Sequence, residues 1–147
     1  MSLLKLPKRQ SPCPCHSGLT FAECCNPLLR GEPAATAEAL MRSRFTAFAV
    51  GDGDYLWRTL HPDHPDRAIP RDVWLATMRR ETRDNRYLGL KVLGASEAGD
   101  RATVTFLARI MRHARDASFG ERSLFARTSD GWLYLSGETL PPGEVSP

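Results

Sequence analysis

All four cysteines of the chain lie close together near its start, in the segment CPCHSGLTFAECC. Cys13, Cys15, Cys24 and Cys25 form the pattern C-x-C-x8-C-C, two pairs joined by a short loop. Such a loop can bring four thiolates to one point, and four thiolates at about 2.3 Å are a ligand set of structural zinc. Because four protein ligands leave no open position, we expect a structural role for the metal. The same sulfur tetrahedron also suits iron.

Other uses of clustered cysteines fit this segment less well. A redox dithiol typically has C-x-x-C spacing beside a βαβ pattern, and neither is found in this sequence. The first ten residues, MSLLKLPKRQ, contain an apolar stretch of only a few residues, broken by lysines and a proline. Such a stretch is too short and too polar for a secretory signal or a membrane span, so we predict a cytoplasmic protein. Structural disulfides are rare in that reducing compartment. His16, beside Cys15, is a further candidate that could replace one thiol or hydrogen-bond to it.

The composition indicates one folded domain with a small appendage. The 147 residues are 41% hydrophobic and 25% charged, which is ordinary for a globular protein. The net charge of +3 is small, and both signs are interspersed, so the composition permits nucleic-acid binding without indicating it. The feature most like a basic cluster is the group Lys5, Lys8 and Arg9, which lies just ahead of the first cysteine.

The residues after the cysteines have helical periodicity as far as about residue 83. A first helix is predicted between Thr36, a suitable cap, and Gly51, which can end it. A short second helix follows and is closed by Pro62, and a third begins after Pro70, which suits a first helical turn. The residues of the third helix that we expect to face the core are Val73, Trp74 and Met78.

From residue 87 onward the hydrophobic period changes to two, which is typical of strands. Four strands are predicted: LGLKVLGA, ATVTFLARIMRH, ERSLFARTSD and GWLYLSGET. Helices followed by strands argue for an α+β domain, because parallel pairing would require crossovers between the strands. We therefore expect three helices packed on a curved antiparallel sheet, a cone that can enclose a pocket.

The cysteine segment resembles the SEC-C motif, a small zinc-binding module named for the carboxyl end of the translocase motor SecA. The four cysteines and Ser17-Gly18 match the motif, and His16 stands where glycine is usual. From about residue 13 to 139, the segments LMRSRFTAFAVGDGDYLWRTLHP, LGL, FLAR, ERSLF and DGWLYLSG together resemble the YchJ family of bacterial proteins.

The family resemblance implies a fold and a division of the chain. It implies an amino-terminal zinc knuckle followed by a domain similar to nuclear transport factor 2, a cystatin-like cone. We accordingly expect a tail and knuckle over residues 1–33, the cone over residues 34–140 and a flexible tail over residues 141–147.

Arg44 is the anomalous residue of the first predicted helix. On a helical wheel of about 100° per residue it lies between Leu40 and Phe48, inside the apolar sector. A guanidinium directed toward the core requires a carboxylate, carbonyl groups or an anionic ligand, because an unpaired buried charge is costly. An ion pair with Glu121 or Glu138 would satisfy it, as would a side chain that reaches water at the helix edge.

Four further residues are candidates for the pocket. His61, in HPDHPD, could act as a general base or bind a second metal, although a proline-stiffened loop is the more ordinary interpretation. Trp57 could be a ligand platform, or simply part of the core. Arg109 and Glu121 interrupt apolar strand patterns, but the register that would point them inward is not fixed by sequence. If they converge with Arg44 and His61, the pocket suits a small anionic molecule.

The favoured function is that of a zinc-binding adaptor. SEC-C modules are associated with docking of the chaperone SecB and with ribosomes, so the resemblance implies a protein or ribonucleoprotein partner in secretion or quality control. Nucleic acid is expected only as part of a ribosome, and no membrane partner is expected. The alternative is a binder of a small anionic ligand, or an enzyme, that uses the cone pocket. A non-enzymatic role is favoured because no nucleophile triad, phosphate loop or dinucleotide fingerprint is found.

Overall fold

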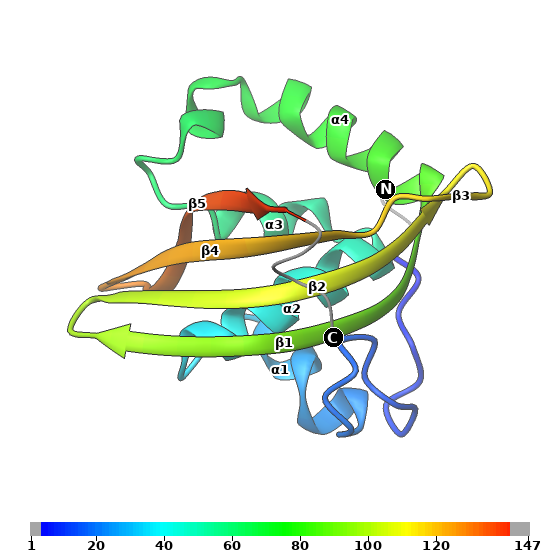
Figure 1. Ribbon diagram of the computed structural model, residues 1–147, viewed down its shortest axis with the longest axis horizontal. Helices are drawn as coiled ribbons and strands as arrows, with labels where there is room; N and C mark the ends of the chain where they lie inside the picture. Colours follow the sequence, from blue (N-terminus) through cyan, green and yellow to red (C-terminus); the bar gives the residue numbers. More distant parts are fainter. Residues whose placement is uncertain (1–3, 142–147) are drawn as a thin grey trace.

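The computed structural model describes residues 4–141, which form an α+β fold with helices on one face of an antiparallel sheet (Figure 1). The predicted fold class is confirmed. The flexible tail predicted over residues 141–147 lies, apart from its first residue, outside the described part of the chain. None of the helices in the described residues is long and apolar enough to cross a membrane.

The sheet has the spatial order β1-β2-β4-β5, and a short β3 pairs with β2. Its strands are β1 (Asn85–Ala98), β2 (Arg101–Arg112), β3 (Arg115–Asp116), β4 (Phe119–Thr128) and β5 (Gly131–Leu140). All four predicted strands are present, and β3 is an addition. The register shifts twice within β1 and once in β5, where Leu124 pairs with Ser136 but Phe125 pairs with Tyr134. Because such bulges bend a strand and increase its twist, they contribute to the curvature of the sheet.

The longest helices are α2 (Ala37–Val50) and α4 (Arg71–Asp84). The shorter elements are η1 (Phe21–Glu23), α1 (Cys25–Leu29), α3 (Gly53–Arg58) and η2 (Pro65–Ala68). Helix α2 has the predicted ends: the Thr36 side chain accepts a hydrogen bond from the Ala39 amide at 3.0 Å, and Gly51 takes a left-handed φ of 83°. These contacts satisfy backbone groups that a helix end leaves open.

One inward-facing residue of α4 was predicted wrongly. Val73 is 53% exposed, whereas Trp74 is 4% exposed. The Trp74 indole N–H donates to Asp66 Oδ2 at 3.0 Å, and its ring packs on Trp57 with centroids 5.3 Å apart. Since neighbouring helical residues point about 100° apart, the orientation that buries Trp74 turns Val73 toward water.

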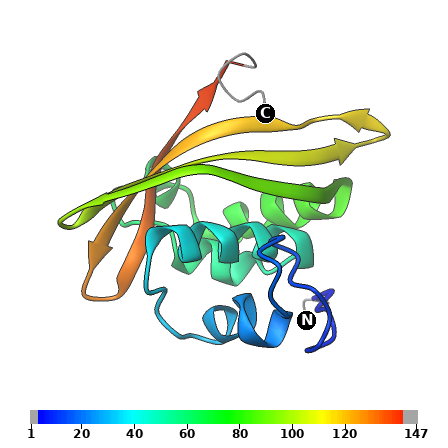
Figure 2. The same cartoon turned by 60° about the horizontal axis from the view of Figure 1, so that its bottom comes forward.

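Helix α2 lies between the sheet and the cysteine segment, as Figure 2 shows, with the concave face of the sheet on one side and residues 11–29 on the other. It is therefore buried on nearly every side, unlike an ordinary amphipathic surface helix. Arg42 and Thr46 contact the cysteine segment, whereas Arg44 and Phe45 face the interior of the cone. The two candidate sites thus share one helix.

Candidate metal centre and cone cavity

The four cysteine sulfurs converge on one point. All four ligand atoms lie within 4.8 Å of one another, with Cys15 Sγ 3.5 Å from Cys24 Sγ, which is 3.9 Å from Cys25 Sγ. Four sulfurs arranged tetrahedrally at about 2.3 Å from a metal ion would be about 3.8 Å apart, so the donor set fits such an ion. These separations far exceed a disulfide bond, and all four cysteines are free.

A tight loop and the start of a helix bring the sulfurs together. The Cys13 amide donates to the Leu19 carbonyl at 2.9 Å, and the His16 amide donates to the Cys13 carbonyl at 3.1 Å. The loop needs left-handed backbone at His16, with φ of 62°, and at Gly18, with φ of 91°. His16 is not in the cluster of converging ligand atoms; its ring meets Phe45 edge-on with centroids 6.3 Å apart.

The cysteine site is built into the core rather than appended to it. The exposed fractions of Cys13, Cys15 and Cys25 are 3%, 0% and 2%. From α2, the Thr46 hydroxyl donates to Cys25 Sγ at 3.2 Å, and Arg42 Nη1 donates to the Cys15 carbonyl at 3.0 Å. The cluster therefore fixes the knuckle to the helix that also lines the cone.

The thiols strongly influence one another's protonation. Hydrogen bonds from Cys13 and Cys25 lower the pKa of Cys15, whereas burial raises the pKa of Cys24 to about 11. Ser17 Oγ lies 3.1 Å from Cys24 Sγ and can stabilise a thiolate there. A bound divalent cation would favour the thiolate form of all four cysteines.

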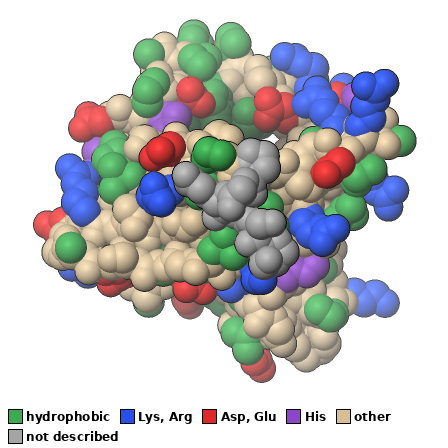
Figure 3. Space-filling view, viewed as in Figure 1, with side chains coloured by type: hydrophobic (Ala, Val, Ile, Leu, Met, Phe, Trp, Pro, Cys, Tyr) green, Lys and Arg blue, Asp and Glu red, His purple; other side chains and the backbone are tan. Residues whose placement is uncertain are grey.

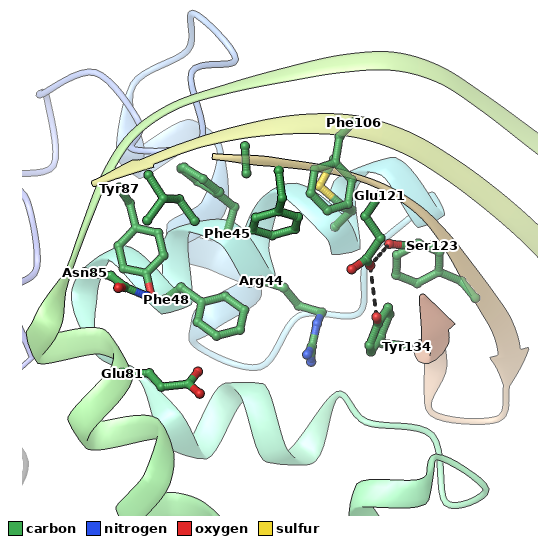
Figure 4. A pocket seen from close by; sticks show the side chains of 15 residues that line it. Arg44, Phe45, Phe48, Glu81, Asn85, Tyr87, Phe106, Glu121, Ser123 and Tyr134 are labelled. Atoms are coloured by element: carbon green, nitrogen blue, oxygen red, sulfur yellow. Dashed lines mark hydrogen bonds between the residues drawn. The ribbon is translucent and has the colours of Figure 1, made fainter. Parts of the chain in front are cut away.

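A second candidate site is a cavity of about 240 Å³ between α2 and the concave face of the sheet (Figure 4). Its wall is mainly apolar: Met41, Phe45, Phe48, Phe106, Ala108, Ile110, Phe119 and Phe125. Glu121, Ser123 and Tyr134 lie at one end, Glu81, Asn85 and Tyr87 at the other, and Arg44 enters from α2. An apolar cavity with a few convergent polar groups is typical of small-molecule sites.

Arg44 is buried in the cavity wall, with 8% of its surface exposed. Its Nη1 donates to the Leu56 carbonyl at 2.9 Å and to Thr59 Oγ1 at 2.5 Å, and its guanidinium lies 4.7 Å from the centre of the Tyr134 ring. Burial lowers the pKa of Arg44 to about 10, so the group remains charged at neutral pH. Among the described residues it forms no ion pair; Glu138 instead meets Arg122 at 3.8 Å.

Glu121 is held by two hydroxyl groups. Its Oε2 accepts from Ser123 Oγ at 2.5 Å and from Tyr134 Oη at 2.9 Å. Burial, together with the adjacent Glu121, raises the pKa of Tyr134, so that its phenol stays protonated and able to donate. Tyr134 therefore touches two charged groups of the cavity wall, Arg44 with its ring and Glu121 with its hydroxyl.

Three of the five predicted pocket residues lie outside the cavity wall. Trp57 packs against Trp74 with their ring planes tilted, and the Arg67 guanidinium lies 4.7 Å from the centre of the Trp57 ring. His61 Nδ1 accepts from the Asp63 amide at 3.0 Å, in the turn after α3. Arg109 is exposed on the outer face of β2, because Ala108 and Ile110 take the inward positions. The predicted convergence holds for Arg44 and Glu121 alone.

Several polar residues of the cavity were not found from the sequence. Strand alternation does place Ser123 on the same face as Glu121, and this signal was available. Tyr134 joins them only through the register of β4 and β5, which a bulge shifts. Asn85 begins β1, and its buried Oδ1 has no hydrogen-bond partner among the described residues. A water molecule or a ligand that donates a hydrogen bond would satisfy this atom.

Together, the cone and the cysteine cluster define an α+β protein of the nuclear transport factor 2-like fold with an amino-terminal metal-binding motif. The chain belongs to the YchJ-like family: residues 36–137 match the description "YchJ, middle NTF2-like domain", and residues 10–27 match the SEC-C motif. The predicted boundary between residues 33 and 34 lies between the two matched segments. The family resemblance seen in the sequence is confirmed.

Relatives resemble the chain over nearly its whole length. The UPF0225 protein SG1365 of Sodalis glossinidius is 38% identical over 94% of this chain and 90% of that protein. A SEC-C motif containing protein from Rhodopseudomonas palustris is 41% identical, with a TM-score of 0.76 over 88% of this chain and 98% of the other. A second SEC-C motif containing protein, from Psychrobacter arcticus, shares the fold with a TM-score of 0.72. It is 22% identical, and the match covers 90% of this chain and 85% of the other.

Proposed function

We propose that the chain is a small-molecule-binding protein, in which the cone cavity takes a ligand with an anionic group and the cysteine site holds a structural zinc ion. The observation that carries this proposal is the state of Arg44. Its guanidinium is charged, buried and without a carboxylate partner among the described residues, where only its Nη1 makes hydrogen bonds. A buried charge is costly unless it is paired, and an anion in the cavity would pair with it.

The remainder of the cavity supports a ligand that is largely apolar. Phenylalanine side chains from α2, β2 and β4 surround the space beside Arg44. Burial of apolar ligand atoms against these rings would supply affinity, and the guanidinium would set the orientation. The small volume favours a ligand with one ring or a short aliphatic chain.

The ligand proposal is tested by the affinity of 3-phenylpropanoate, measured calorimetrically on the metal-loaded full chain. Arg44→Met is expected to lower that affinity by about tenfold to a hundredfold, since a hydrogen bond to a charged group contributes about 1.5–3 kcal/mol. The chain should still fold, because an apolar side chain of similar length replaces a buried charge.

Arg109→Met is the matched control, since it removes an arginine from the outer face of the sheet. Affinity for 3-phenylpropanoate should be unchanged in this variant. Equal affinity in wild type and Arg44→Met, or an equal loss in both variants, would exclude Arg44 as the anion-binding group.

A second role, docking on a ribonucleoprotein or protein partner, is favoured by a group of exposed arginines. They gather where α4 ends beside β3, and we call this group the basic corner: Arg79, Arg80, Arg83, Arg86, Arg112 and Arg115 (Figure 3). Asp84 is the acid that contacts them, at 3.3 Å from Arg83 and 4.0 Å from Arg112. Near the knuckle, Leu19 is 51% exposed and Lys8 and Arg9 are exposed, which also supports a contact there.

Docking is tested by sedimentation with purified ribosomes at increasing salt. We expect binding that weakens steeply with salt and is reduced in the double variant Arg83→Glu, Arg112→Glu, because these changes reverse charges that would face phosphates. Arg44→Met serves as the control and should sediment as wild type. Sedimentation that is independent of salt and unaffected by the double variant would rule out the basic corner as the docking surface.

A further inference from the structure

At one end of the cone cavity, away from Glu81, two residues of opposite charge lie near each other without meeting (Figure 4). Arg44 and Glu121 both line it, yet they form no ion pair among the described residues. We propose that the cavity selects a small zwitterion, an amino carboxylic acid with an apolar side chain, whose carboxylate pairs with Arg44 and whose ammonium group pairs with Glu121. This inference rests on the proposed function, because it requires that the cavity bind a ligand.

Each charged group keeps unused hydrogen-bonding capacity. Arg44 uses Nη1 for its two hydrogen bonds, and its Nε and Nη2 have no partner among the described residues. Glu121 uses Oε2 for both of its hydroxyl contacts, and its Oε1 has none there. Figure 4 shows the Glu121 side chain directed into the same space that Arg44 enters. A donor and an acceptor are therefore available to one bound molecule.

Tyr134 fixes the two groups relative to each other. Its ring lies under the Arg44 guanidinium at 4.7 Å, and its hydroxyl donates to Glu121 at 2.9 Å. The backbone of Tyr134 is held in turn, since its amide donates to the Thr59 carbonyl and its carbonyl accepts from the His61 amide, both at 2.8 Å. A site held in this way can distinguish ligands by the spacing of their charged groups.

The presence of both charges argues against a simple anion as the preferred ligand. A carboxylate placed at Arg44 would also lie near Glu121, which repels it through a medium of low polarity. An amine placed at Glu121 would be repelled by Arg44 in the same way. A zwitterion satisfies both groups at once, and its side chain can pack on Phe45, Phe106 and Phe119.

Three compounds with the same phenyl group test the selection on the metal-loaded, wild-type full chain. They are L-phenylalanine, 3-phenylpropanoate and 2-phenylethylamine, and binding is followed through the methyl NMR signals of Ala108 and Ile110 in the cavity wall. L-phenylalanine is expected to bind at least about tenfold more tightly than either single-charge compound. Equal affinity for L-phenylalanine and 3-phenylpropanoate would overturn the zwitterion and leave anion binding intact. Binding of none of the three would overturn both proposals.

A variant identifies the group that recognises the amine. Glu121→Gln should lower the affinity for L-phenylalanine about tenfold and should leave that for 3-phenylpropanoate unchanged or higher. Glu138→Gln is the matched control, since Glu138 pairs with Arg122 in an exposed contact. Equal losses for both compounds in Glu121→Gln would show a structural effect only and would contradict the assignment. The wild-type comparison stands even if this variant does not fold.

Discussion

Removal of metal from the cysteine site is expected to lower the melting temperature of the whole chain. Cys13, Cys15 and Cys25 are buried against α2, and Thr46 and Arg42 of that helix bond to the cysteine segment. Loss of the metal would remove the bonds that hold the four sulfurs together beside the central helix of the cone, and any thiolates that remained there would repel one another. The effect should therefore spread beyond residues 11–29.

The size of this effect follows from linkage. With free zinc at about 1,000 times Kd, binding to the folded state alone contributes about 4 kcal/mol to the free energy of unfolding. For a chain of this length, about 1 kcal/mol shifts the melting temperature by about 2–4 °C, so we expect a decrease of about 8–16 °C on chelation. Calorimetry with and without a thiol-competing chelator measures it, and elemental analysis of the same sample should find zinc.

Two variants separate ligand loss from local disturbance. Cys25→Ser should abolish binding of one metal ion per chain and reproduce the lower melting temperature. Ser17→Ala removes a hydroxyl that lies 3.1 Å from Cys24 Sγ but keeps every ligand, and should retain the metal. If the metal-free chain melted at the temperature of the metal-loaded chain, the site would not brace α2.

Gly137→Ala is expected to destabilise the chain and to disturb the cavity. Gly137 of β5 pairs with Ser123, and a Cβ atom added there would come closer than 3.0 Å to Tyr134 Oη and to the Glu121 carboxylate. One of these groups, or the strand itself, must move. We expect the free energy of unfolding in urea to fall by about 1–3 kcal/mol, the usual cost of overpacking.

The matched control is Gly94→Ala. Gly94 also lies in a strand of this sheet, β1, and an added Cβ would find no atom within 4 Å. Its effect should remain within about 0.5 kcal/mol, as for most exposed substitutions. If the two variants had equal stability, the chain would have room for a side chain at residue 137 beside Tyr134 and Glu121, which would contradict the expected clash.

The sequence predicted the elements that depend on local signals. Thr36 and Gly51 mark the ends of α2 because capping and left-handed backbone are local properties of these residue types. The four cysteines were identified by type and spacing alone, and their sulfurs converge as expected. Arg44 was singled out from the helical period, and it is buried.

The cavity was only partly predictable because it depends on register and on long-range packing. Arg109 faces outward while Glu121 faces inward, and the sequence left both directions open. Tyr134 of β5 donates a hydrogen bond to Glu121 of the neighbouring strand β4, past an irregularity in the pairing of the two strands. No local sequence pattern encodes this contact. That the cysteine segment packs on the opposite side of the helix that carries Arg44 is likewise a property of the tertiary structure.

The most direct test of the central claim observes Arg44 itself. In the metal-loaded, wild-type chain, the side-chain Nε–H signal of Arg44 can be followed by NMR during titration with 3-phenylpropanoate. We predict a saturable downfield shift of this signal, as expected when the guanidinium donates to a carboxylate, while the Nε–H signal of Arg42, which already donates to Glu38 at 3.1 Å, stays in place. Saturable binding that leaves the Arg44 signal unmoved would contradict the claim that this buried guanidinium is the anion-binding group of the cone.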